Sequence, residues 1–202
     1  KNGVHNVLEP ATFGVPIVIG TEFKKSAKKR PQFWKALIQE ARTIYCGEIT
    51  YSSNWDNYAS IDFWEELDYI GISAYFPILN KDKPSVSAVK KAWKGPTNVM
   101  RSFAKKKNKK VLFTEYGYLA VARTTYNNWE LEKKVHQLNI DEDAQANALE
   151  ALYDTFYAED FWAGGFLWKW FPNNQGHEGY IEKDYTPQDK KAEAILKKYF
   201  AQ

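Results

Sequence analysis

Short apolar runs alternate with amphipathic stretches along this chain, and that alternation constrains its fold more than any other feature. The predicted strands occupy residues 16–20, 48–53, 69–74, 110–114 and 163–168. The second is not an apolar run, since Ile49 and Tyr51 alternate there with polar neighbours. Apolar residues recur at spacings of three and four over 31–45, 85–103, 141–156 and 187–199, which predicts helices there. The second of these helices should bend or break at Gly95-Pro96. Since parallel strands need a crossover of about a dozen or more residues, usually a helix, the pattern predicts parallel βα units.

The loops indicate which kind of α/β fold this is. No strand is followed by a Gly-x-Gly-x-x-Gly turn or a Gly-Lys-Ser/Thr loop, which disfavours a nucleotide-binding sheet. Long aromatic loops follow the strands and precede the helices, as on the functional face of a (β/α)8 barrel. We expect residues 1–202 to be one catalytic barrel domain that lacks part of its N-terminal half. Only about strands four to eight are evident, with Ile, Val and Phe side chains facing the interior. A missing segment or a second chain would complete the barrel.

Composition excludes several classes of protein. The chain is 202 residues long, 44% apolar and 26% charged, and no apolar run approaches the roughly 18 residues of a membrane span. Its net charge of +3 comes from dispersed basic runs that we interpret as solvated faces, so no nucleic-acid partner is expected. The high aromatic content, 16%, suggests flat apolar surfaces used for binding.

Cysteine and histidine usage argues against metal or disulfide chemistry. Cys46 is the single cysteine, and we interpret it as a buried or half-buried structural thiol. His5, His136 and His177 share no metal-ligand spacing, so neither a metal nor another cofactor is expected. These features leave the compartment open, with a secreted or periplasmic protein slightly favoured over a cytoplasmic one.

Two apolar runs end in the same way, each with Thr-Glu. Glu22 follows the first run and Glu115 follows the fourth. A residue directly after a parallel strand lies at the carboxyl edge of the sheet, where such folds place their chemistry. Strands three apart face each other across the mouth of a barrel, so these two carboxyl groups should meet over a bound substrate. One can remain ionised as a nucleophile while the other is held protonated as an acid. The simpler alternative is that each glutamate caps a helix or pairs with a surface lysine.

Aromatic residues cluster beside the same strand ends. Trp55, Tyr75, Tyr118 and Trp168 each follow one of the predicted strands. Sugar rings present C–H faces that lie flat on indole and phenol rings, while polar side chains bond the hydroxyls. Phe166, within the last run, is better explained as a core residue.

Several motifs, taken in order, resemble glycoside hydrolase family 113, the β-mannanases of a large clan of retaining (β/α)8 glycosidases. They are Ile19-Gly20-Thr21-Glu22, Tyr51-Ser52-Ser53-Asn54-Trp55-Asp56, Asp68-Tyr69-Ile70-Gly71-Ile72-Ser73-Ala74-Tyr75-Phe76-Pro77, Phe113-Thr114-Glu115-Tyr116-Gly117-Tyr118, Gly165-Phe166-Leu167-Trp168-Lys169-Trp170-Phe171-Pro172 and Asp184-Tyr185-Thr186-Pro187-Gln188. The resemblance runs from about Val15 to the C-terminus. It differs from the wider clan in having Thr21, rather than Asn, before the first glutamate.

The resemblance implies hydrolysis of β-1,4-mannosidic bonds with retained configuration. Glu22 would be the general acid/base and Glu115 the nucleophile. We expect Tyr116, Tyr118 and the neighbouring strand ends to donate hydrogen bonds that keep Glu115 ionised, and Glu22 to have the raised pKa of an acid. The sugar subsites for a β-linked oligo- or polysaccharide would be lined by Asn54, Trp55, Tyr75, Tyr118 and Trp168.

Other functions remain open at this stage. The protein could be a non-catalytic carbohydrate-binding barrel or a related β-glycosidase with a different sugar specificity, and the sequence does not separate endo from exo action. An aldolase-like reaction would need a lysine at a strand end, and Lys169 is the candidate. The presence of both glutamates favours the glycosidase.

Overall fold

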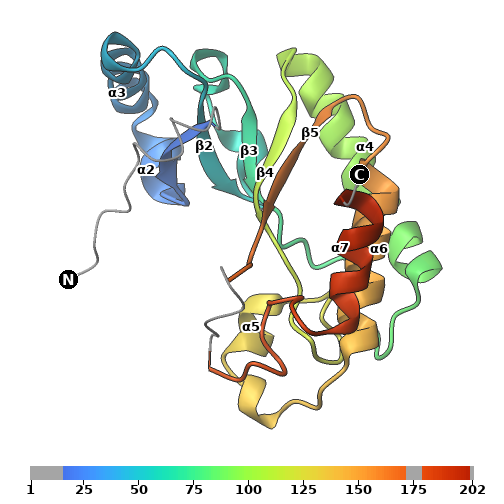
Figure 1. Ribbon diagram of the computed structural model, residues 1–202. Coiled ribbons are helices and arrows are strands. Elements are labelled where there is room, and N and C mark those ends of the chain that lie inside the picture. The colour runs from blue at the N-terminus through green and yellow to red at the C-terminus, as the bar shows by residue number, and fades with distance from the viewer. Residues whose placement is uncertain (1–15, 172–178, 201–202) are drawn as a thin grey trace.

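The computed structural model describes residues 16–171 and 179–200, which form one parallel sheet with helices around it (Figure 1). The strands are β1 (Ile17–Thr21), β2 (Ile49–Asn54), β3 (Ile70–Ser73), β4 (Val111–Tyr116) and β5 (Trp162–Leu167). They lie in the sheet in chain order, and each is parallel to the next. The strands predicted from the sequence are all present, as consecutive βα units of the kind that build a (β/α)8 barrel.

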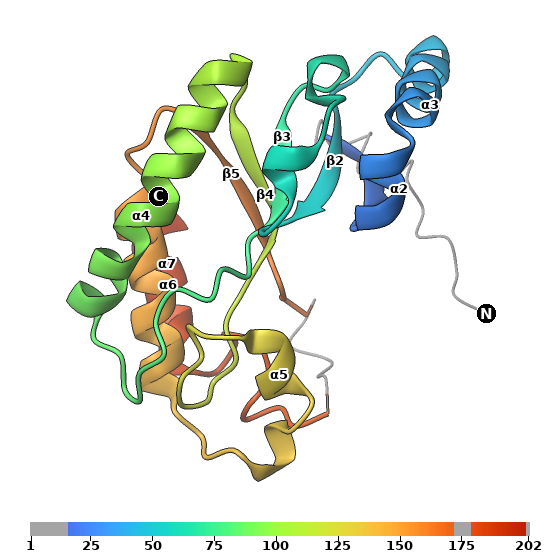
Figure 2. The same cartoon turned by 180° about the vertical axis from the view of Figure 1, so that it is seen from behind.

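The helices lie outside the sheet in two groups (Figures 1 and 2). α2 (Lys24–Lys29) and α3 (Pro31–Ile44) lie beside the β1–β2 end, followed by short 3-10 turns at Tyr58–Ser60 and Trp64–Glu66. α4 (Val86–Lys107), α6 (Glu142–Phe156) and α7 (Lys191–Phe200) cover the β4–β5 end, with α6 packed between α4 and α7. α5 (Asn128–Glu132) and a 3-10 turn at Val135–Gln137 lie in the long loop after β4.

Local sequence signals account for several helix ends. Asp141, the first residue of the predicted 141–156 helix, accepts a hydrogen bond from the Ala144 amide at 2.9 Å and is the N-cap of α6. Pro31 occupies the first turn of α3, where its missing N–H costs nothing. Of the two predicted outcomes at Gly95-Pro96, a bend or a break, the break does not occur, since α4 continues through Pro96. α7 begins four residues later than predicted, because Pro187–Lys190 form a turn before it.

The two faces of the sheet differ in chemistry. Ile72 and Phe113 are fully buried toward the helices, and the Phe113 ring packs 4.9 Å from that of Phe156 in α6. Their strand neighbours point to the opposite face. There the Ser52 hydroxyl lies 3.0 Å from that of Ser73 and 2.6 Å from that of Thr114. The expectation of Ile and Phe on the interior face was therefore wrong for these strands. The aliphatic and aromatic side chains serve the helix interface, and small hydroxyl residues line the concave face.

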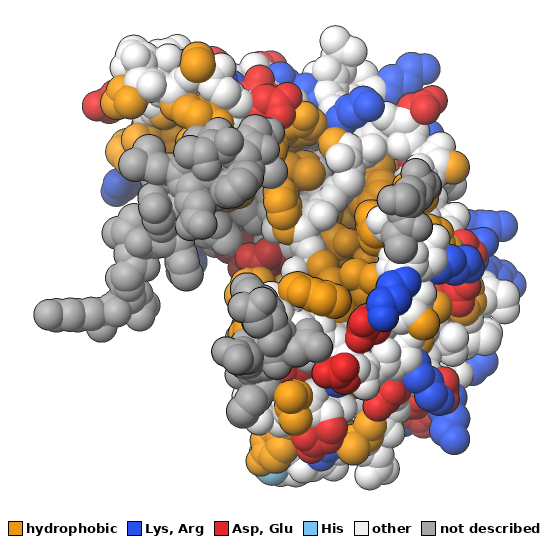
Figure 3. Space-filling model, in the orientation of Figure 1, with side chains coloured by type: hydrophobic (Ala, Val, Ile, Leu, Met, Phe, Trp, Pro, Cys, Tyr) orange, Lys and Arg blue, Asp and Glu red, His pale blue; other side chains and the backbone are white. Residues whose placement is uncertain are grey.

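The outer strands are less buried than the inner ones. β3 is buried along its whole length, whereas β1 is only half-buried and β5 alternates with exposed positions. Phe166 of β5 is 42% exposed, so its interpretation as a core residue was wrong. Figure 3 shows apolar side chains exposed in this region of the molecule. Both outer strands present a hydrogen-bonding edge to which no described strand is paired.

Two further features bear on the sequence analysis. Cys46 is exposed rather than buried, because α3 ends at Ile44 and Cys46 lies in the turn beyond its apolar face. Among the helices of the described residues, none combines the length and apolar character that a membrane span requires.

Candidate active site

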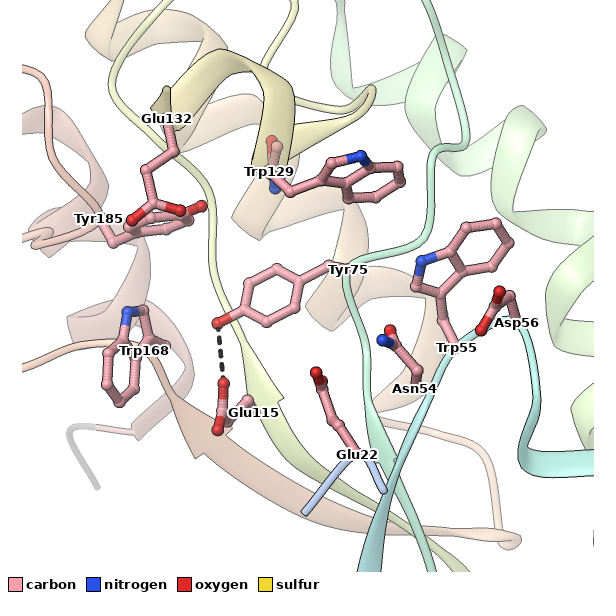
Figure 4. Close-up of a pocket in the computed structure, with 11 residues that line it drawn as sticks. Glu22, Asn54, Trp55, Asp56, Tyr75, Glu115, Trp129, Glu132, Trp168 and Tyr185 are labelled. Carbon is pink, nitrogen blue, oxygen red and sulfur yellow. Dashed lines mark hydrogen bonds between the residues drawn. The ribbon is translucent and has the colours of Figure 1, made fainter. Parts of the chain in front are cut away.

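A cavity of about 570 Å³ opens at the carboxyl ends of the strands. It receives one or more side chains from the end of every strand and from the loop that contains α5 (Figure 4). The lining residues are Glu22, Asn54, Trp55, Asp56, Tyr75, Glu115, Asn128, Trp129, Glu132, Trp168 and Tyr185. The structure thus brings together all of the predicted site residues except Tyr118.

Tyr118 lies in the core and not in the cavity. It is 3% exposed, and its carbonyl oxygen accepts a hydrogen bond from the Gln145 side chain of α6 at 2.9 Å. Tyr116 is also buried, with its hydroxyl 3.1 Å from that of Tyr153. Strict alternation would put Glu115 on the helix face with Phe113, but the pairing register of β4 shifts against both neighbouring strands at this point. Glu115 therefore faces the cavity, and Tyr116 faces α6. The predicted hydrogen bonds from these two tyrosines to Glu115 were therefore wrong.

Tyr75 donates the hydrogen bond that Glu115 receives. Its hydroxyl lies 3.3 Å from Oε2 of Glu115 (Figure 4). Burial raises the pKa of the Glu115 carboxyl, the nearby charge of Glu22 raises it further, and the Tyr75 bond lowers it. Burial and the Glu115 charge also raise the pKa of Tyr75, so this phenol stays protonated and available as a donor. Glu22 is therefore close enough to influence the ionisation of Glu115.

Glu22 has an unusual backbone at the end of β1. Its φ is +55°, a left-handed conformation that a non-glycine residue adopts at a cost. The Glu22 amide donates to the Ser52 carbonyl at 2.8 Å, which ties this turn to β2. Strained residues of this kind concentrate at functional sites. In Figure 4 the side chains of Glu22 and Glu115 project toward the same part of the cavity.

Aromatic rings form the walls on both sides of the glutamates. Trp168 follows β5, next to the strand of Glu115, and Trp55 follows β2, next to the strand of Glu22. The Trp168 amide donates to the Tyr116 carbonyl at 2.7 Å. At Gly117 a Cβ atom would lie only 2.0 Å from the Trp168 carbonyl oxygen, so glycine permits this close approach. Lys169 lies with its Nζ 4.3 Å from the centre of the Trp168 ring.

The loops contribute cavity residues that the sequence reasoning missed: Asp56, Asn128, Trp129, Glu132 and Tyr185. Tyr185 belongs to a motif of the family resemblance, and its ring lies 6.1 Å from that of Tyr75. Trp129 stood out only as an aromatic residue in a long loop. Among the described residues, which exclude His5 and His177, no group of three His, Cys, Asp or Glu side chains could hold a metal ion.

Comparison with known proteins shows which family the chain belongs to. The model of Glycoside Hydrolase Family 113 matches residues 12–190. No curated protein sequence matches the chain.

Solved structures match the fold. A GH113 β-1,4-mannanase complex has a TM-score of 0.75 at 22% identity, over 97% of this chain and 61% of that chain. The GH113 β-mannanase of Alicyclobacillus acidocaldarius in complex with ManMIm also has a TM-score of 0.75, at 24% identity over 96% of this chain and 60% of that one. A β-glucuronidase of Faecalibacterium prausnitzii has a TM-score of 0.58 at 17% identity, over 84% of this chain and 28% of that one. The chain therefore spans about three fifths of the length of the two mannanases.

Proposed function

Because the chain belongs to glycoside hydrolase family 113, we propose that it is the greater part of a retaining endo-β-1,4-mannanase whose catalytic pair is Glu115 and Glu22. The observation that supports this most is the meeting of both carboxyl groups, from β4 and β1, in one aromatic-walled cavity. Family membership alone would not assign the roles of these two residues. The hydrogen bond that Glu115 accepts from Tyr75 supports an assignment.

Glu115 is suited to be the nucleophile. Its carboxylate attacks the anomeric carbon of the sugar and forms a glycosyl ester, while the glycosidic oxygen leaves with a proton from Glu22. Water then attacks the same carbon, Glu22 takes the proton of that water, and the bond to Glu115 breaks. Two inversions give net retention. The Tyr75 hydroxyl favours the ionised form of Glu115, the form that attacks. We expect the two carboxyl groups to lie about 5 Å apart in the complete barrel, as in retaining enzymes.

The lining supports a neutral sugar as substrate. Trp168 and Trp55 offer flat faces, and Asn54 and Asn128 offer amides that can bond hydroxyl groups. Among the described residues that line the cavity, none is Lys, Arg or His. A uronate would thus meet Glu22, Glu115 and Glu132 without an adjacent cation in the lining. This argues against the glucuronide specificity that fold similarity to a β-glucuronidase might suggest.

Proton NMR during hydrolysis of a β-manno-oligosaccharide tests the proposed mechanism. The full polypeptide should release the β-anomer first, and the α-anomer should appear only later, by mutarotation. First release of the α-anomer would contradict the retaining assignment. Parallel reactions with β-1,4-gluco-oligosaccharides test the sugar, since mannose and glucose differ only in the orientation of one hydroxyl. Faster hydrolysis of the gluco-oligosaccharides would reject the assignment as a mannanase but would still support a glycoside hydrolase.

A further inference from the structure

The helix α4 is strongly basic. It contains seven basic side chains and no acidic one, and Lys109 and Lys110 follow shortly after its end. Since the whole chain has a net charge of only +3, the rest of the chain is net acidic. The basic residues of α4 are Lys90, Lys91, Lys94, Arg101, Lys105, Lys106 and Lys107.

Four of these cations lie in one row along the helix. Lys91, Lys94, Arg101 and Lys105 recur at multiples of three and four residues, so their side chains share one side of α4, and all four are exposed. The buried residues of α4 lie on another side, where the Trp93 ring packs 5.0 Å from that of Phe156 in α6. The row therefore runs along the outside of the molecule, beside the contact of α4 with α6.

Two cavities lie along this row. The first, of about 460 Å³, lies between residues 87–94 of α4 and Thr155 of α6. The second, of about 530 Å³, lies between residues 101–110 and residues 158–161, which follow α6. Both segments advance in the same direction from the first cavity to the second. We call the two cavities together the α4–α6 groove.

Part of the charge in the groove is neutralised within the protein. Lys90 pairs with Asp154 at 2.9 Å, and Arg101 pairs with Glu159 at 2.6 Å. Other ammonium groups in the lining form no ion pair or hydrogen bond among the described residues; they are those of Lys91, Lys94, Lys105 and Lys110. Asp160 adds a further carboxylate to the described lining, so the groove keeps a net positive charge.

The spacing of the cations indicates which kind of anion fits. Successive cations of the row lie one or two helical turns apart, and one turn is about 5.4 Å. Duplex DNA carries one charge per about 1.7 Å, which is much denser. A polyuronate carries one carboxylate per sugar ring, and such a ring is about as long as one helical turn. The row therefore matches a linear polymer of sugar acids better than a nucleic acid.

The row also lacks the apolar side chains of a membrane-binding helix. Such a helix inserts large apolar residues beside its cations. Val99 is an exposed large apolar residue of α4, but its position in the helical repeat places it on another side from Lys94 and Arg101. A lipid surface is therefore a poorer partner for this groove than a soluble polymer.

We propose that the α4–α6 groove binds an acidic polysaccharide, a polyuronate, at a site separate from the catalytic cavity. The cavity lies at the carboxyl ends of the strands, whereas Lys110 and Asp160 precede β4 and β5, so the groove reaches the opposite end of the sheet. α4 lies on the outside of the sheet, so a polymer bound there leaves the cavity open (Figure 2). The inference goes beyond the proposed function and does not depend on it.

Binding of the full polypeptide to polygalacturonate, measured by calorimetry at an ionic strength of about 0.05 M, tests the proposal. The wild-type protein should bind, and added salt should weaken the binding, because exposed charges are screened. The variant Lys91→Gln/Lys94→Gln/Lys105→Gln/Lys110→Gln should raise Kd at least about tenfold. Arginine at the same four positions keeps the charge and should leave Kd within about threefold.

A matched control separates the groove from net charge. The variant Lys28→Gln/Lys29→Gln/Lys81→Gln/Lys134→Gln removes the same charge from exposed lysines outside the groove, and its Kd should stay within about threefold of wild type. Equal losses in the two glutamine variants would overturn the proposal. Tighter binding of duplex DNA or of anionic phospholipid vesicles than of polygalacturonate would overturn it as well, because the groove would then serve another class of partner.

A second readout uses the wild-type protein and so does not depend on the folding of a variant. A carbodiimide activates the carboxylates of a bound oligogalacturonate, and a lysine amine in contact attacks the activated carbon to form an amide with release of a urea. Peptide mapping of the full polypeptide should find these amides mainly on Lys91, Lys94, Lys105 and Lys110. Equal labelling of Lys28 and Lys29 in α2 would contradict a site in the groove.

Discussion

At the scale of single residues, the ionisation of Glu115 is set by opposing influences. Burial and the Glu22 charge favour its neutral form, and the hydrogen bond from Tyr75 favours its charged form. A nucleophile must be ionised, so the acidic limb of the kcat/KM profile should follow the Glu115 pKa. In the proposed mechanism the nucleophile is therefore a glutamate whose pKa lies above the ordinary value.

Tyr75→Phe and Glu22→Gln should move this acidic limb in opposite directions. Loss of the Tyr75 bond raises the pKa of Glu115, so the limb moves to higher pH. Loss of the Glu22 charge lowers that pKa, so the limb moves to lower pH. Both pH profiles of kcat/KM should be measured with β-mannobiosyl fluoride, because its fluoride leaves without protonation by a general acid. Movement of both limbs in the same direction would contradict this electrostatic arrangement.

Glu115 also links activity to stability. The pKa of Glu115 is higher in the folded protein than in the unfolded chain, so the charged carboxylate destabilises the fold. Its contribution to stability is full at a pH below the pKa of the unfolded chain and is lost as the pH rises through the pKa of the folded protein. Glu115→Gln should therefore abolish hydrolysis yet raise the melting temperature at pH 7 by a few degrees. At a pH below the unfolded pKa the two proteins should melt alike. Calorimetry at the two pH values measures this, and a variant that melts lower at pH 7 would be inconsistent with it.

Gly117 is the backbone contact between the ends of β4 and β5. Gly117→Ala would place a methyl group 2.0 Å from the Trp168 carbonyl oxygen, so one of the two strand ends must move. We expect kcat/KM on mannan to fall at least about tenfold, because a displacement of about 1 Å at a reacting site can cost on the order of a hundredfold. Gly95→Ala in α4 is the control, since nothing lies within 4 Å of its Cβ position. This variant should keep its activity, because Gly95 lies in α4 and not at a strand end.

At the scale of elements, the segment Asp184–Lys190 positions one wall of the cavity. Lys190 and Asp184 form an ion pair at 2.7 Å with side chains only 5% and 3% exposed. Gln188 holds the Phe171 backbone through two hydrogen bonds, of 2.6 and 2.7 Å, just beyond Trp168. One segment therefore supports both Tyr185 and the chain that carries Trp168.

Lys190→Met should destabilise the protein by about 3–5 kcal/mol, because it leaves the Asp184 carboxylate buried without its cation. The neighbouring Lys191→Met removes a pair with Asp143 whose side chains are 58% and 69% exposed, and should cost about 0–1 kcal/mol. Urea unfolding of both variants checks the contrast. Similar losses of unfolding free energy in the two variants would show that burial of the Lys190–Asp184 pair does not affect stability.

The elements were predictable from the sequence to different degrees. Apolar runs located four of the strands, and the alternation of Ile49 and Tyr51 with polar residues located β2. The position at a strand end located Glu22 and Glu115. Tyr118 was misplaced because the sequence does not show the register shift within β4 that changes which residues face the cavity. Trp129 and Glu132 were missed because their place depends on how the long loop folds back over the strand ends. That fold is fixed by contacts distant in sequence, such as Asn128 with Gly117.

At the scale of the whole molecule, the sheet is open. The outer strands β1 and β5 have unpaired edges in the described part of the chain, and apolar side chains such as Phe166 and Trp170 are exposed. Open edges favour association with another strand, and a closed barrel has none. We therefore expect further βα units, from a longer polypeptide of about 300 residues or from another chain, to close the sheet.

The 202 residues expressed alone should accordingly fail to form an active monomer. Solution mass from light scattering should show association or aggregation, and mannan hydrolysis should be absent or at least about a hundredfold below that of the full polypeptide. A monodisperse monomer with full activity would show that the open sheet is sufficient. The full polypeptide serves as the positive control in both measurements.

The central claim is that Glu115 attacks the sugar while Glu22 handles the proton. A 2-deoxy-2-fluoro-β-mannosyl fluoride tests it most directly, because the ring fluorine slows both steps and the good leaving group lets the ester accumulate. Mass spectrometry of the digested full polypeptide should then find one fluoromannosyl group, on the peptide that contains Glu115. A label on Glu22 would reverse the two roles. An unlabelled protein that still hydrolyses mannan would contradict the covalent mechanism.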